Sequence, residues 1–446
     1  MTGIALALTL LSGCDADKPV DVFLIAVDTL RVDHVGAYNA KSPAKTPNMD
    51  ALARDGVRFD DAFSPVSVTG PAFASVMTGR DPAGHGVMVN LFRNGAPLAA
   101  EQVTIAERFL AAGYRTAAFV SAFTLRPALG LDQGFSVYNT PGNQNRYGDM
   151  TADQMSAWLQ VQEGPVFSWY HSFDPHGPVK RFLREGDLHE GLEADPLLAA
   201  HIPDYQQIEG YTDPVLYETL YARGVEFADE QVGTVLASIK RTGRYEDAII
   251  ILFADHGEGF RERTLWYDHG AFPHVEQTRV PLIVKMPGGA GSGTVDTRLT
   301  SLLDIAPTVL SVAQLPPLEH ADGGVLTKTG VLHETLSAES SHCKRIPVLK
   351  CAPHGGVGKL VAVRDEEQTL VSESRTGGEH EAQYDRLGDP KEWTASLRTA
   401  EGPLLEALRE IRSDRRKREY PPLPGLPNGQ TSDAEERQLM ELGYLE

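Results

Sequence analysis

Acidic and imidazole side chains follow two of the most apolar stretches of this chain. The stretch 20–28 ends in Asp28, and the stretch AIIILFAD at 248–255 ends in Asp255 and leads directly into His256. Carboxylate and imidazole groups gathered in one place can hold a divalent cation, and such a cation can activate a hydroxyl group or a water molecule. We therefore expect these residues to form one site.

A third apolar stretch, 166–173, is followed by Asp174 and His176, so that acid or imidazole groups follow three such stretches. Any one of these residues alone would be explained as a helix cap or as a satisfied polar group, but three coincidences favour a site. Gly257 and Gly259 follow His256. Glycine lets a backbone turn sharply, and we expect these two to allow a close approach to a ligand.

Thr69 is the candidate nucleophile. Pro71 and Gly79 bracket a short helix, which places Thr69 and Gly70 at its N-cap. One interpretation is that Thr69 is simply the cap and accepts a backbone N–H. The other is that an ester oxyanion bound there faces free N–H donors and the positive end of the helix. A threonine hydroxyl attacks only if a base or a metal ion lowers its pKa, which the neighbouring cation could do.

The elements that must position these residues form an α/β pattern. Near-continuous apolar runs without alternation predict strands covered on both faces, and helical patterns lie between them. The runs are 20–28, 116–123, 166–173, 248–255 and 280–287, and the helical patterns are 46–56, 101–113, 220–243 and 301–313. This order predicts a largely parallel central sheet flanked by helices, in which ligands gather beyond the carboxyl ends of the strands.

The pattern changes after about residue 340. The stretch 359–374 predicts a two-strand hairpin, 404–419 predicts a charged helix, and the proline-rich stretch 421–429 predicts a wrapped tail. We therefore predict a main α/β domain over residues 14–340 and a smaller C-terminal α+β subdomain over residues 341–446.

The N-terminal residues predict export. Ile4–Leu11 is too short to span a bilayer but suits the apolar part of a signal peptide, and Leu11-Ser12-Gly13-Cys14 resembles a bacterial lipobox. Cys14 would then carry lipid, residues 1–13 would be removed, and the protein would be periplasmic or at the cell surface. No Lys or Arg precedes the apolar run, so a misread start followed by a buried strand is the alternative.

Composition excludes one class of partner. The chain has 446 residues with 41 Lys and Arg against 61 Asp and Glu, a net charge of −20, and nucleic-acid binding needs a basic surface instead. Most of the acidic groups are expected on a solvated surface. Cys343 and Cys351 are close in sequence and predict a local disulfide in an exported protein, with a reduced pair as the alternative.

Eight stretches, in order along the chain, resemble the sulfatase family of the alkaline phosphatase superfamily. They are VDTLRVDHVGAY (27–38), TPNMDALARDGVRF (46–59), TGPAFASVMTGRDPAGHGV (69–87), GLDQGF (130–135), FDPHGP (173–178), FADHGEGF (253–260), RVPLIV (279–284) and DIAPTVL (304–310). The resemblance covers nearly the whole chain. It implies an α/β sandwich around a largely parallel sheet and metal-assisted hydrolysis of sulfate or phosphate esters.

The resemblance also implies roles for single residues. Asp28, Asp255 and His256 fall on metal ligands, and Thr69 falls on the nucleophile, which also touches the metal. One divalent ion is expected. Relatives that use threonine usually hold zinc or manganese, and an imidazole ligand agrees with these ions better than with calcium, which remains possible.

His176, in its H-x-P setting, and His269, in the DHG after the DHGEGF stretch, fall on positions that bind the ester oxygens or protonate the leaving group. The chain also departs from the family pattern. Sulfatases carry Cys or Ser, oxidised to formylglycine, where this chain has Thr69, and an arginine where it has Phe73. Many begin their metal site with two adjacent aspartates, whereas Thr29 follows the first acid here. These departures bring the chain closer to phosphodiesterases and phospho-group transferases that use threonine.

Three hypotheses follow. The first is an exported hydrolase of small-molecule, glycan or lipid esters that forms a covalent Thr69 ester. The second is a transferase to a lipid or glycan hydroxyl, and the third is an inactive binding homologue. Membrane transferases of this type carry several transmembrane helices, which this sequence does not predict, and an inactive homologue would tend to lose ligands that are all present. We therefore favour the hydrolase, with membrane contact through the lipid anchor only and no predicted oligomeric state.

The nucleophile favours one kind of ester. Phosphodiesters match sulfate monoesters in charge, so a site with one cation, His176 and His269 accommodates either. Formylglycine hydrate releases sulfate by collapsing to the aldehyde, but a Thr69 ester must be cleaved by attacking water, as in phosphate chemistry. We therefore expect phosphodiesters or phosphonate esters to react faster than aryl sulfates.

Overall fold

The computed structural model describes residues 18–90, 96–142, 144–189, 195–263, 266–340, 360–375, 378–395 and 402–417. Cys14, Cys343, Cys351 and the proline-rich stretch lie outside these residues, so the lipid attachment, the disulfide and the wrapped tail stay predictions. Within these ranges, the helices include none of the length and apolarity that crossing a bilayer requires.

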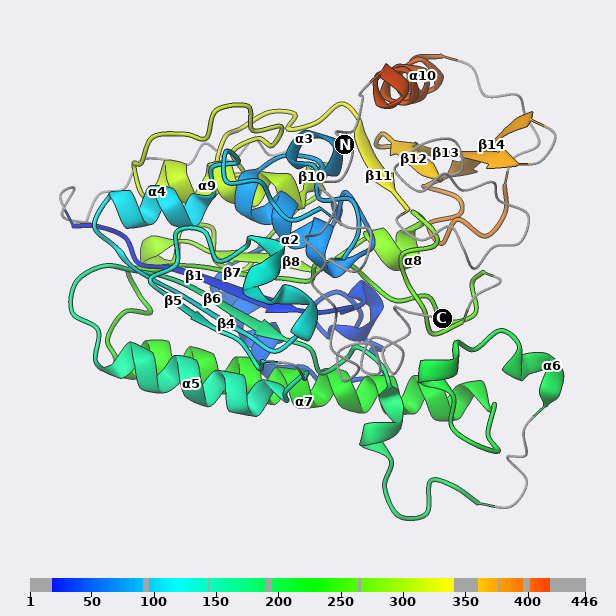
Figure 1. Ribbon diagram of the computed structural model, residues 1–446, viewed down its shortest axis with the longest axis horizontal. Helices are drawn as coiled ribbons and strands as arrows, with labels where there is room; N and C mark the ends of the chain where they lie inside the picture. The colour runs from blue at the N-terminus through cyan, green and yellow to red at the C-terminus, as the bar shows by residue number, and fades with distance from the viewer. Residues whose placement is uncertain are drawn as a thin grey trace, which may run out of the picture.

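The predicted sheet is confirmed. Its strands are β1 (Val22–Val27), β2 (Val57–Phe59), β4 (Arg115–Val120), β5 (Val137–Asn139), β6 (Val166–Ser172), β7 (Ile249–Phe253), β8 (Leu282–Lys285) and β9 (Thr294–Asp296). They lie in the order β5-β4-β6-β1-β7-β8-β2-β9 (Figure 1). The five strands from β5 to β7 run parallel, whereas β8 runs antiparallel to β7. The three short strands β2, β5 and β9 were not predicted from the sequence.

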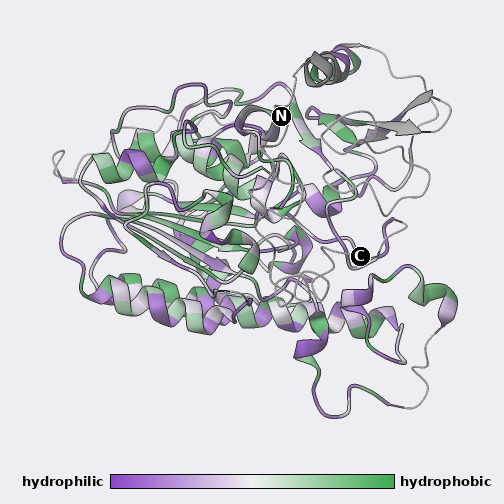
Figure 2. Cartoon of the chain, viewed as in Figure 1, coloured by the Kyte–Doolittle hydropathy of each residue, from purple (hydrophilic) through white to green (hydrophobic). Residues whose placement is uncertain are grey.

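Strand β1 lies at the centre of the sheet, between β6 and β7. Every residue of β1, β6 and β7 is buried, as the unbroken apolar runs predict. Figure 2 shows these strands as mainly hydrophobic and the helices below them as mixed. Because all three strands are covered on both faces, a ligand can reach polar side chains of this part of the sheet only at the strand ends.

Helices cover both faces of the sheet (Figure 1). One layer contains α5 and α7, and the opposite layer contains α2, α4 and α9. The helices are α1 (Pro47–Asp55), α2 (Thr69–Thr78), α4 (Ile105–Ala111), α5 (Gly148–Gln160), α7 (Pro214–Arg241) and α9 (Ile305–Val312). Helix α7 begins six residues before the predicted start, because Asp213 caps it by accepting the Val215 N–H at 2.9 Å and Pro214 occupies its first position.

The C-terminal part forms a second, antiparallel sheet. Its strands are β11 (Leu336–Glu339), β12 (Val361–Arg364), β13 (Gln368–Arg375) and β14 (Gly378–Asp385), and it is covered by helix α10 (Pro403–Lys417). The predicted hairpin corresponds to β12 and β13, and leucines of α10 pack on their apolar side chains. The division of the chain at residue 340 stays a prediction, and β11, from just before it, already pairs with β12.

The turn at Gly134, which packs against helix α4, requires glycine. Gly134 has a φ of +85°, and a Cβ atom there would lie 2.1 Å from the backbone nitrogen of Glu107, in the first turn of α4. Gly243, after α7, has a φ of +70° but nothing within 4 Å of the same position. Substituting Gly243 would therefore introduce backbone strain alone, whereas substituting Gly134 would introduce both strain and a steric clash.

We expect Gly243→Ala to lower the free energy of unfolding by about 1–2 kcal/mol, the cost of a left-handed non-glycine residue. Gly134→Ala should cost about 3 kcal/mol or more, because overpacking against the α4 backbone adds to that strain. Guanidinium unfolding of the two variants measures both values. Equal losses would show that α4 gives way at no cost.

Candidate functional site

The carboxyl ends of β6, β1 and β7 meet at one edge of the sheet, as the sequence predicts. Asp28 follows β1 directly, and its N–H donates to the Ser172 carbonyl at 2.9 Å, which continues the pairing with β6. Asp255 and His256 follow β7. Each of these three side chains offers one ligand atom, all of these atoms lie within 4.8 Å of one another, and all three residues are fully buried.

Each carboxylate has one oxygen committed and one oxygen directed into the site. Asp28 Oδ2 accepts from His171 Nε2 at 3.1 Å, and Asp255 Oδ1 accepts from the N–H groups of Thr29 at 3.2 Å and His256 at 2.9 Å. The second oxygens, Asp28 Oδ1 and Asp255 Oδ2, are buried without a hydrogen-bond partner among the described residues. They lie 4.0 and 3.4 Å from His256 Nε2.

His256 presents a lone pair to these two oxygens. Its Nδ1 lies 2.9 Å from the Gly257 carbonyl oxygen, which can only accept, so Nδ1 carries a hydrogen and the neutral ring has its lone pair on Nε2. Two unpartnered carboxylate oxygens and an imidazole lone pair are a suitable donor set for one divalent cation, and imidazole suits zinc or manganese better than calcium. The residues present therefore fit the metal that the sequence predicts.

The two aspartates resist ionisation when they are enclosed without a cation. Burial raises the pKa of Asp28 to about 7, and burial together with the neighbouring charge of Asp28 raises the pKa of Asp255 to about 7. An adjacent positive charge would favour the ionised form of both.

Thr69 faces this cluster from helix α2, which lies in the layer across the sheet from α5 and α7 (Figure 1). Its Oγ1 lies 3.4 Å from His256 Nε2, and Thr69 is fully buried. The predicted N-cap is wrong by one residue, because Val68, with an extended backbone, caps α2 and Thr69 is its first helical residue. The free donors expected there are also partly committed, since the Gly70 N–H donates to Asn90 Oδ1 at 2.7 Å. Thr69 therefore points at the acidic cluster and does not act as a cap.

Two polar residues of the site were missed. His171, inside β6, accepts the Ser121 N–H on Nδ1 at 3.4 Å, so its Nε2 carries the hydrogen that is donated to Asp28. Burial lowers the pKa of His171 to about 4 and keeps it neutral. Asn90 is buried, and its Nδ2 has no hydrogen-bond partner in the described part of the chain. A histidine inside an apolar run was the only signal for His171, and nothing in the sequence marked Asn90.

His176 and Asp174, which the sequence places together, point in different directions. His176 stacks on Phe173 with ring centroids 4.1 Å apart and donates from Nδ1 to the Gly177 carbonyl at 2.8 Å. Burial lowers its pKa to about 3. Asp174 is turned away, because its carboxylate accepts the Gly148 N–H at the start of α5, at 3.0 Å. Only the imidazole of this pair lies near the cluster.

His269 lies between the other two histidines. Its ring centroid is 4.5 Å from that of His256 and 4.8 Å from that of His176. Its Nδ1 is 3.4 Å from each carboxyl oxygen of Glu258, whose pKa burial raises well above its ordinary value. Three imidazoles from separate segments of the chain therefore lie beside one another.

Phe73 and Thr29 are two positions at which the sequence departs from the sulfatase pattern, and the structure shows what surrounds each of them. Phe73 is fully buried, with its ring centroid 4.8 Å from Trp169, 5.1 Å from His171 and 6.1 Å from Phe253. Thr29 has a φ of 53°, unusual for a β-branched residue, and its buried hydroxyl has no partner among the described residues. Backbone strain of this kind persists where the surroundings fix it, often at functional sites.

The glycines after His256 serve the loop itself. A Cβ atom at Gly257 would lie 2.3 Å from the Glu276 carbonyl oxygen, and the Gly257 N–H donates to the Gln277 carbonyl at 2.8 Å. The Gly259 N–H donates to the Asp268 carbonyl at 3.0 Å. The close approach predicted for a ligand is therefore made by neighbouring backbone.

Comparisons with known proteins identify the family to which the chain is similar. A family model described as Sulfatase matches residues 21–315. Human arylsulfatase A is 27% identical over 366 residues, which cover 70% of this chain and 68% of that protein, and an ulvan-active sulfatase of Formosa agariphila is 24% identical over 445 residues, which cover 87% and 80%. The crystal structure of a phosphonate monoester hydrolase of Agrobacterium radiobacter superposes with a TM-score of 0.69, at 23% identity, over 89% of this chain and 96% of that one.

The raised pKa values predict a pH dependence of stability. An aspartate with a pKa near 3.8 when unfolded and about 7 when folded binds more protons in the folded state between these values. In chelator, the melting temperature should therefore fall as pH rises from about 4 to about 7, and a divalent cation should oppose the fall at pH 7. Asp28→Asn, which removes one of the two charges, should flatten this slope. An unchanged slope in Asp28→Asn would contradict the buried like-charge pair.

His171 should set the affinity for the cation. Its hydrogen bond fixes Asp28 Oδ2, and loss of such supporting contacts typically weakens metal binding about 10–100-fold. We expect a loss of this size for His171→Ala and a smaller one for His171→Asn, which keeps an N–H donor. Competition with a chromogenic chelator measures both. Wild-type affinity in His171→Ala, in protein of normal circular dichroism, would exclude this role.

Proposed function

The chain belongs to the sulfatase family, and on this basis we propose that it is a metal-dependent hydrolase that cleaves sulfate or phosphate esters through Thr69. The observation that carries the proposal is the position of Thr69 Oγ1, 3.4 Å from His256 Nε2, at an enclosed cluster with two unpartnered carboxylate oxygens. A hydroxyl placed there is next to the donor set that would hold a cation.

In this proposal Asp28, Asp255, His256 and Thr69 hold one divalent ion. The ion would lower the pKa of the Thr69 hydroxyl and stabilise negative charge on the transferred group. Asp28 and Asp255 are ionised in this state, and His171 together with backbone N–H groups keeps their second oxygens in place.

The residues of the chain then carry out two displacements. Deprotonated Thr69 Oγ1 bonds to the phosphorus or sulfur atom while the bond to the leaving oxygen breaks, and His269 gives that oxygen a proton from Nε2. Glu258, neutral because burial raises its pKa, gives its carboxyl proton to Nδ1 of His269, so that the ring stays neutral. Water then attacks the phosphorus or sulfur atom of the Thr69 ester while the bond to Thr69 Oγ1 breaks; the water proton passes to Nε2 of His269, and the Nδ1 proton returns to Glu258. His176 lies against His269 and limits its orientation.

We expect phosphodiesters and phosphonate monoesters to be the better substrates. A Thr69 ester has no route to an aldehyde and must be hydrolysed by water. Phe73, where the family pattern has arginine, packs among aromatic rings and adds no positive charge, which disfavours the more highly charged phosphate monoesters. Sulfate monoesters are the second candidate, since relatives include proteins named choline-sulfatase and ulvan-active sulfatase.

A substrate panel tests the proposal. Purified protein loaded with zinc, manganese or calcium is assayed with nitrophenyl sulfate, phosphate, phosphodiester and phosphonate monoester. We expect the phosphodiester or phosphonate to have the highest kcat/KM, and we expect Thr69→Ala to lower it by at least about 10³-fold, while Thr69→Ser keeps measurable turnover. Because Thr69 is not the cap of α2, Thr69→Ala should retain normal stability.

Two results would count against this assignment. A sulfate preference of more than a few-fold in kcat/KM would transfer the activity to the second candidate. Near wild-type turnover by Thr69→Ala would remove the covalent mechanism, whichever ester is preferred.

We also propose that the enzyme works outside the cytoplasm, held to a membrane by lipid on Cys14. The support is the apolar stretch followed by Leu11-Ser12-Gly13-Cys14. Mass spectrometry of the mature N-terminus should find an acylated Cys14 and no residues 1–13, and Cys14→Ser should release the protein from membranes. A mature protein that retains residues 1–13 without lipid would contradict this location.

A further inference from the structure

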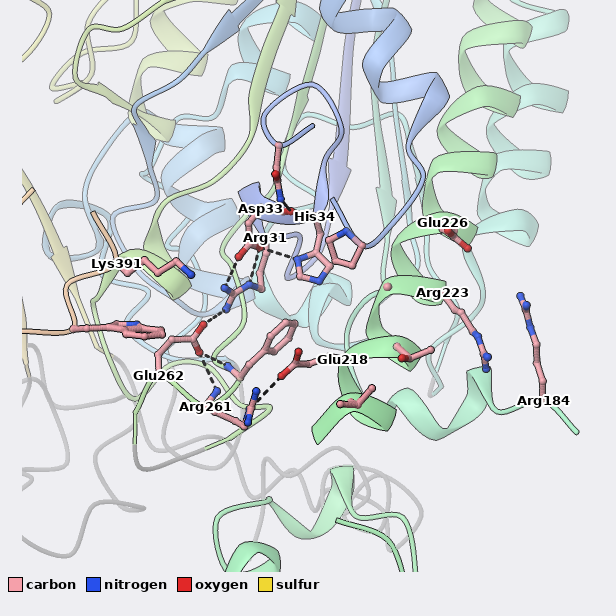
Figure 3. Close-up of a pocket in the computed structure, with 17 residues that line it drawn as sticks. Arg31, Asp33, His34, Arg184, Glu218, Arg223, Glu226, Arg261, Glu262 and Lys391 are labelled. Atoms are coloured by element: carbon pink, nitrogen blue, oxygen red, sulfur yellow. Dashed lines mark hydrogen bonds and ion pairs between the residues drawn. The ribbon is translucent and has the colours of Figure 1, made fainter. Parts of the chain in front are cut away.

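Arg31 links the segment after β1 to the loop that follows β7. It lies three residues after Asp28, and only 8% of it is exposed. Its Nε and Nη2 donate to the two carboxylate oxygens of Asp33 at 3.0 and 2.7 Å. Its Nη1 lies 2.9 Å from Glu262 Oε1 and also donates to the Glu258 carbonyl at 2.7 Å. Figure 3 shows the guanidinium between Asp33 and Glu262, so one buried cation connects two segments of the chain.

Glu262 extends this connection along the loop. Its Oε2 accepts the N–H groups of Phe260 at 2.7 Å and of Arg261 at 3.1 Å. The Phe260 ring in turn lies under the guanidinium, with its centre 4.3 Å from the central carbon of Arg31. Charge-assisted hydrogen bonds and a cation–π contact therefore hold residues 258–262 against Arg31.

The peptide group between Glu258 and Gly259 is the part of this loop nearest the proposed chemistry. Its carbonyl accepts from Arg31, and its N–H donates to the Asp268 carbonyl at 3.0 Å. The Asp268 N–H donates back to the Gly259 carbonyl at 3.3 Å, and His269 is the next residue of the chain. Arg31 thus fixes one side of a peptide group whose other side is paired with the segment that carries His269.

The same peptide group orients the Glu258 side chain. The Gly259 N–H also donates to Glu258 Oε1 at 3.1 Å, and both carboxyl oxygens lie 3.4 Å from His269 Nδ1. Glycine permits many backbone conformations, so the peptide group before Gly259 depends on its partners for its orientation. Without the guanidinium, its carbonyl side would lose the partner described above.

We propose that Arg31 is a positioning residue, which orients this peptide group so that Glu258 and His269 can deliver a proton to the leaving oxygen. The inference rests on the proposed function and adds to it a residue that touches neither the ester nor the cation. A buried ion pair that served stability alone would slow the cleavage of all esters alike. A positioning role instead affects most strongly the esters whose leaving oxygen needs a proton.

The test compares two leaving groups on cation-loaded, full-length protein. The substrates are the 4-nitrophenyl and the phenyl ester of the acid that the wild type cleaves best. Nitrophenolate leaves readily without a proton, whereas the more basic phenolate needs one from His269. We expect Arg31→Ala to lower kcat for the phenyl ester at least about tenfold and for the nitrophenyl ester about threefold or less, with little change in KM.

Arg223→Ala is the matched control. Arg223, on α7, is also largely buried, with 18% of its side chain exposed against 9% for Arg31, and its Nη2 donates to Asp187 at 2.9 Å. It therefore loses a comparable ion pair away from the loop at 258–262. The ratio of kcat between the two esters should stay at the wild-type value in this variant.

Added guanidinium should restore the lost function. Arg31 and Arg223 both line a trough of about 820 Å³ (Figure 3), through which a small cation can reach the space left by Arg31→Ala. Guanidinium below its denaturing concentration should raise phenyl ester turnover by Arg31→Ala, whereas urea, which has the same shape without the charge, should not. Neither should change the ratio in Arg223→Ala.

Arg31→Lys provides a second variant if Arg31→Ala does not fold. One ammonium group cannot meet the Glu258 carbonyl and two carboxylates in a single plane, so the same difference between esters should appear at a smaller size. Equal losses on both esters in the folded Arg31 variants would overturn the proposal, and so would equal restoration by urea.

Hydrogen exchange separates this inference from the proposed function. If the wild type cleaves neither ester, the hydrolase assignment fails, and exchange of the peptide 253–260 still decides the role of Arg31. Exchange at the Gly259 amide should be faster in the folded Arg31 variants and unchanged in Arg223→Ala. Wild-type exchange in every folded Arg31 variant would overturn the positioning role.

Discussion

Two aspartates enclosed side by side are the constraint on which this structure depends. Asp28 and Asp255 end adjacent strands of a sheet buried on both faces, so neither can reach solvent. Like charges in such a place are unstable together without a compensating cation. The surroundings hold each carboxylate by one oxygen and leave the other directed at His256, an arrangement that fits a cation better than a hydrogen-bond network.

The sequence predicts the parts of this arrangement that depend on local pattern. Unbroken apolar runs identify buried strands, and polar residues at their ends identify the edge where the site lies. It fails where the answer depends on contacts between distant segments. His171 is one residue of an apolar run until β6 pairs with β1, and Asn90 becomes relevant only when its chain reaches Gly70. The antiparallel direction of β8 is likewise set by its connection and not by its composition.

The C-terminal sheet takes part in the same site indirectly. The loop that carries His269 continues to Pro273, whose carbonyl accepts from Arg364 at 2.9 Å, and to His274, whose Nε2 lies 3.4 Å from the Tyr384 hydroxyl. Glu392 accepts the Val275 N–H at 3.2 Å. The C-terminal part is therefore not independent of the proposed active site, because its contacts fix the loop from which one proposed catalytic histidine projects.

The aromatic packing of Phe73 limits which side chains this position accepts. Arginine at that position would lie against Trp169 and Phe253, where burial of an unpaired guanidinium costs several kcal/mol. Trp169 and Phe253 would have to be replaced together with Phe73 before arginine became tolerable. Arginine introduced at this position by itself is therefore expected to destabilise the core.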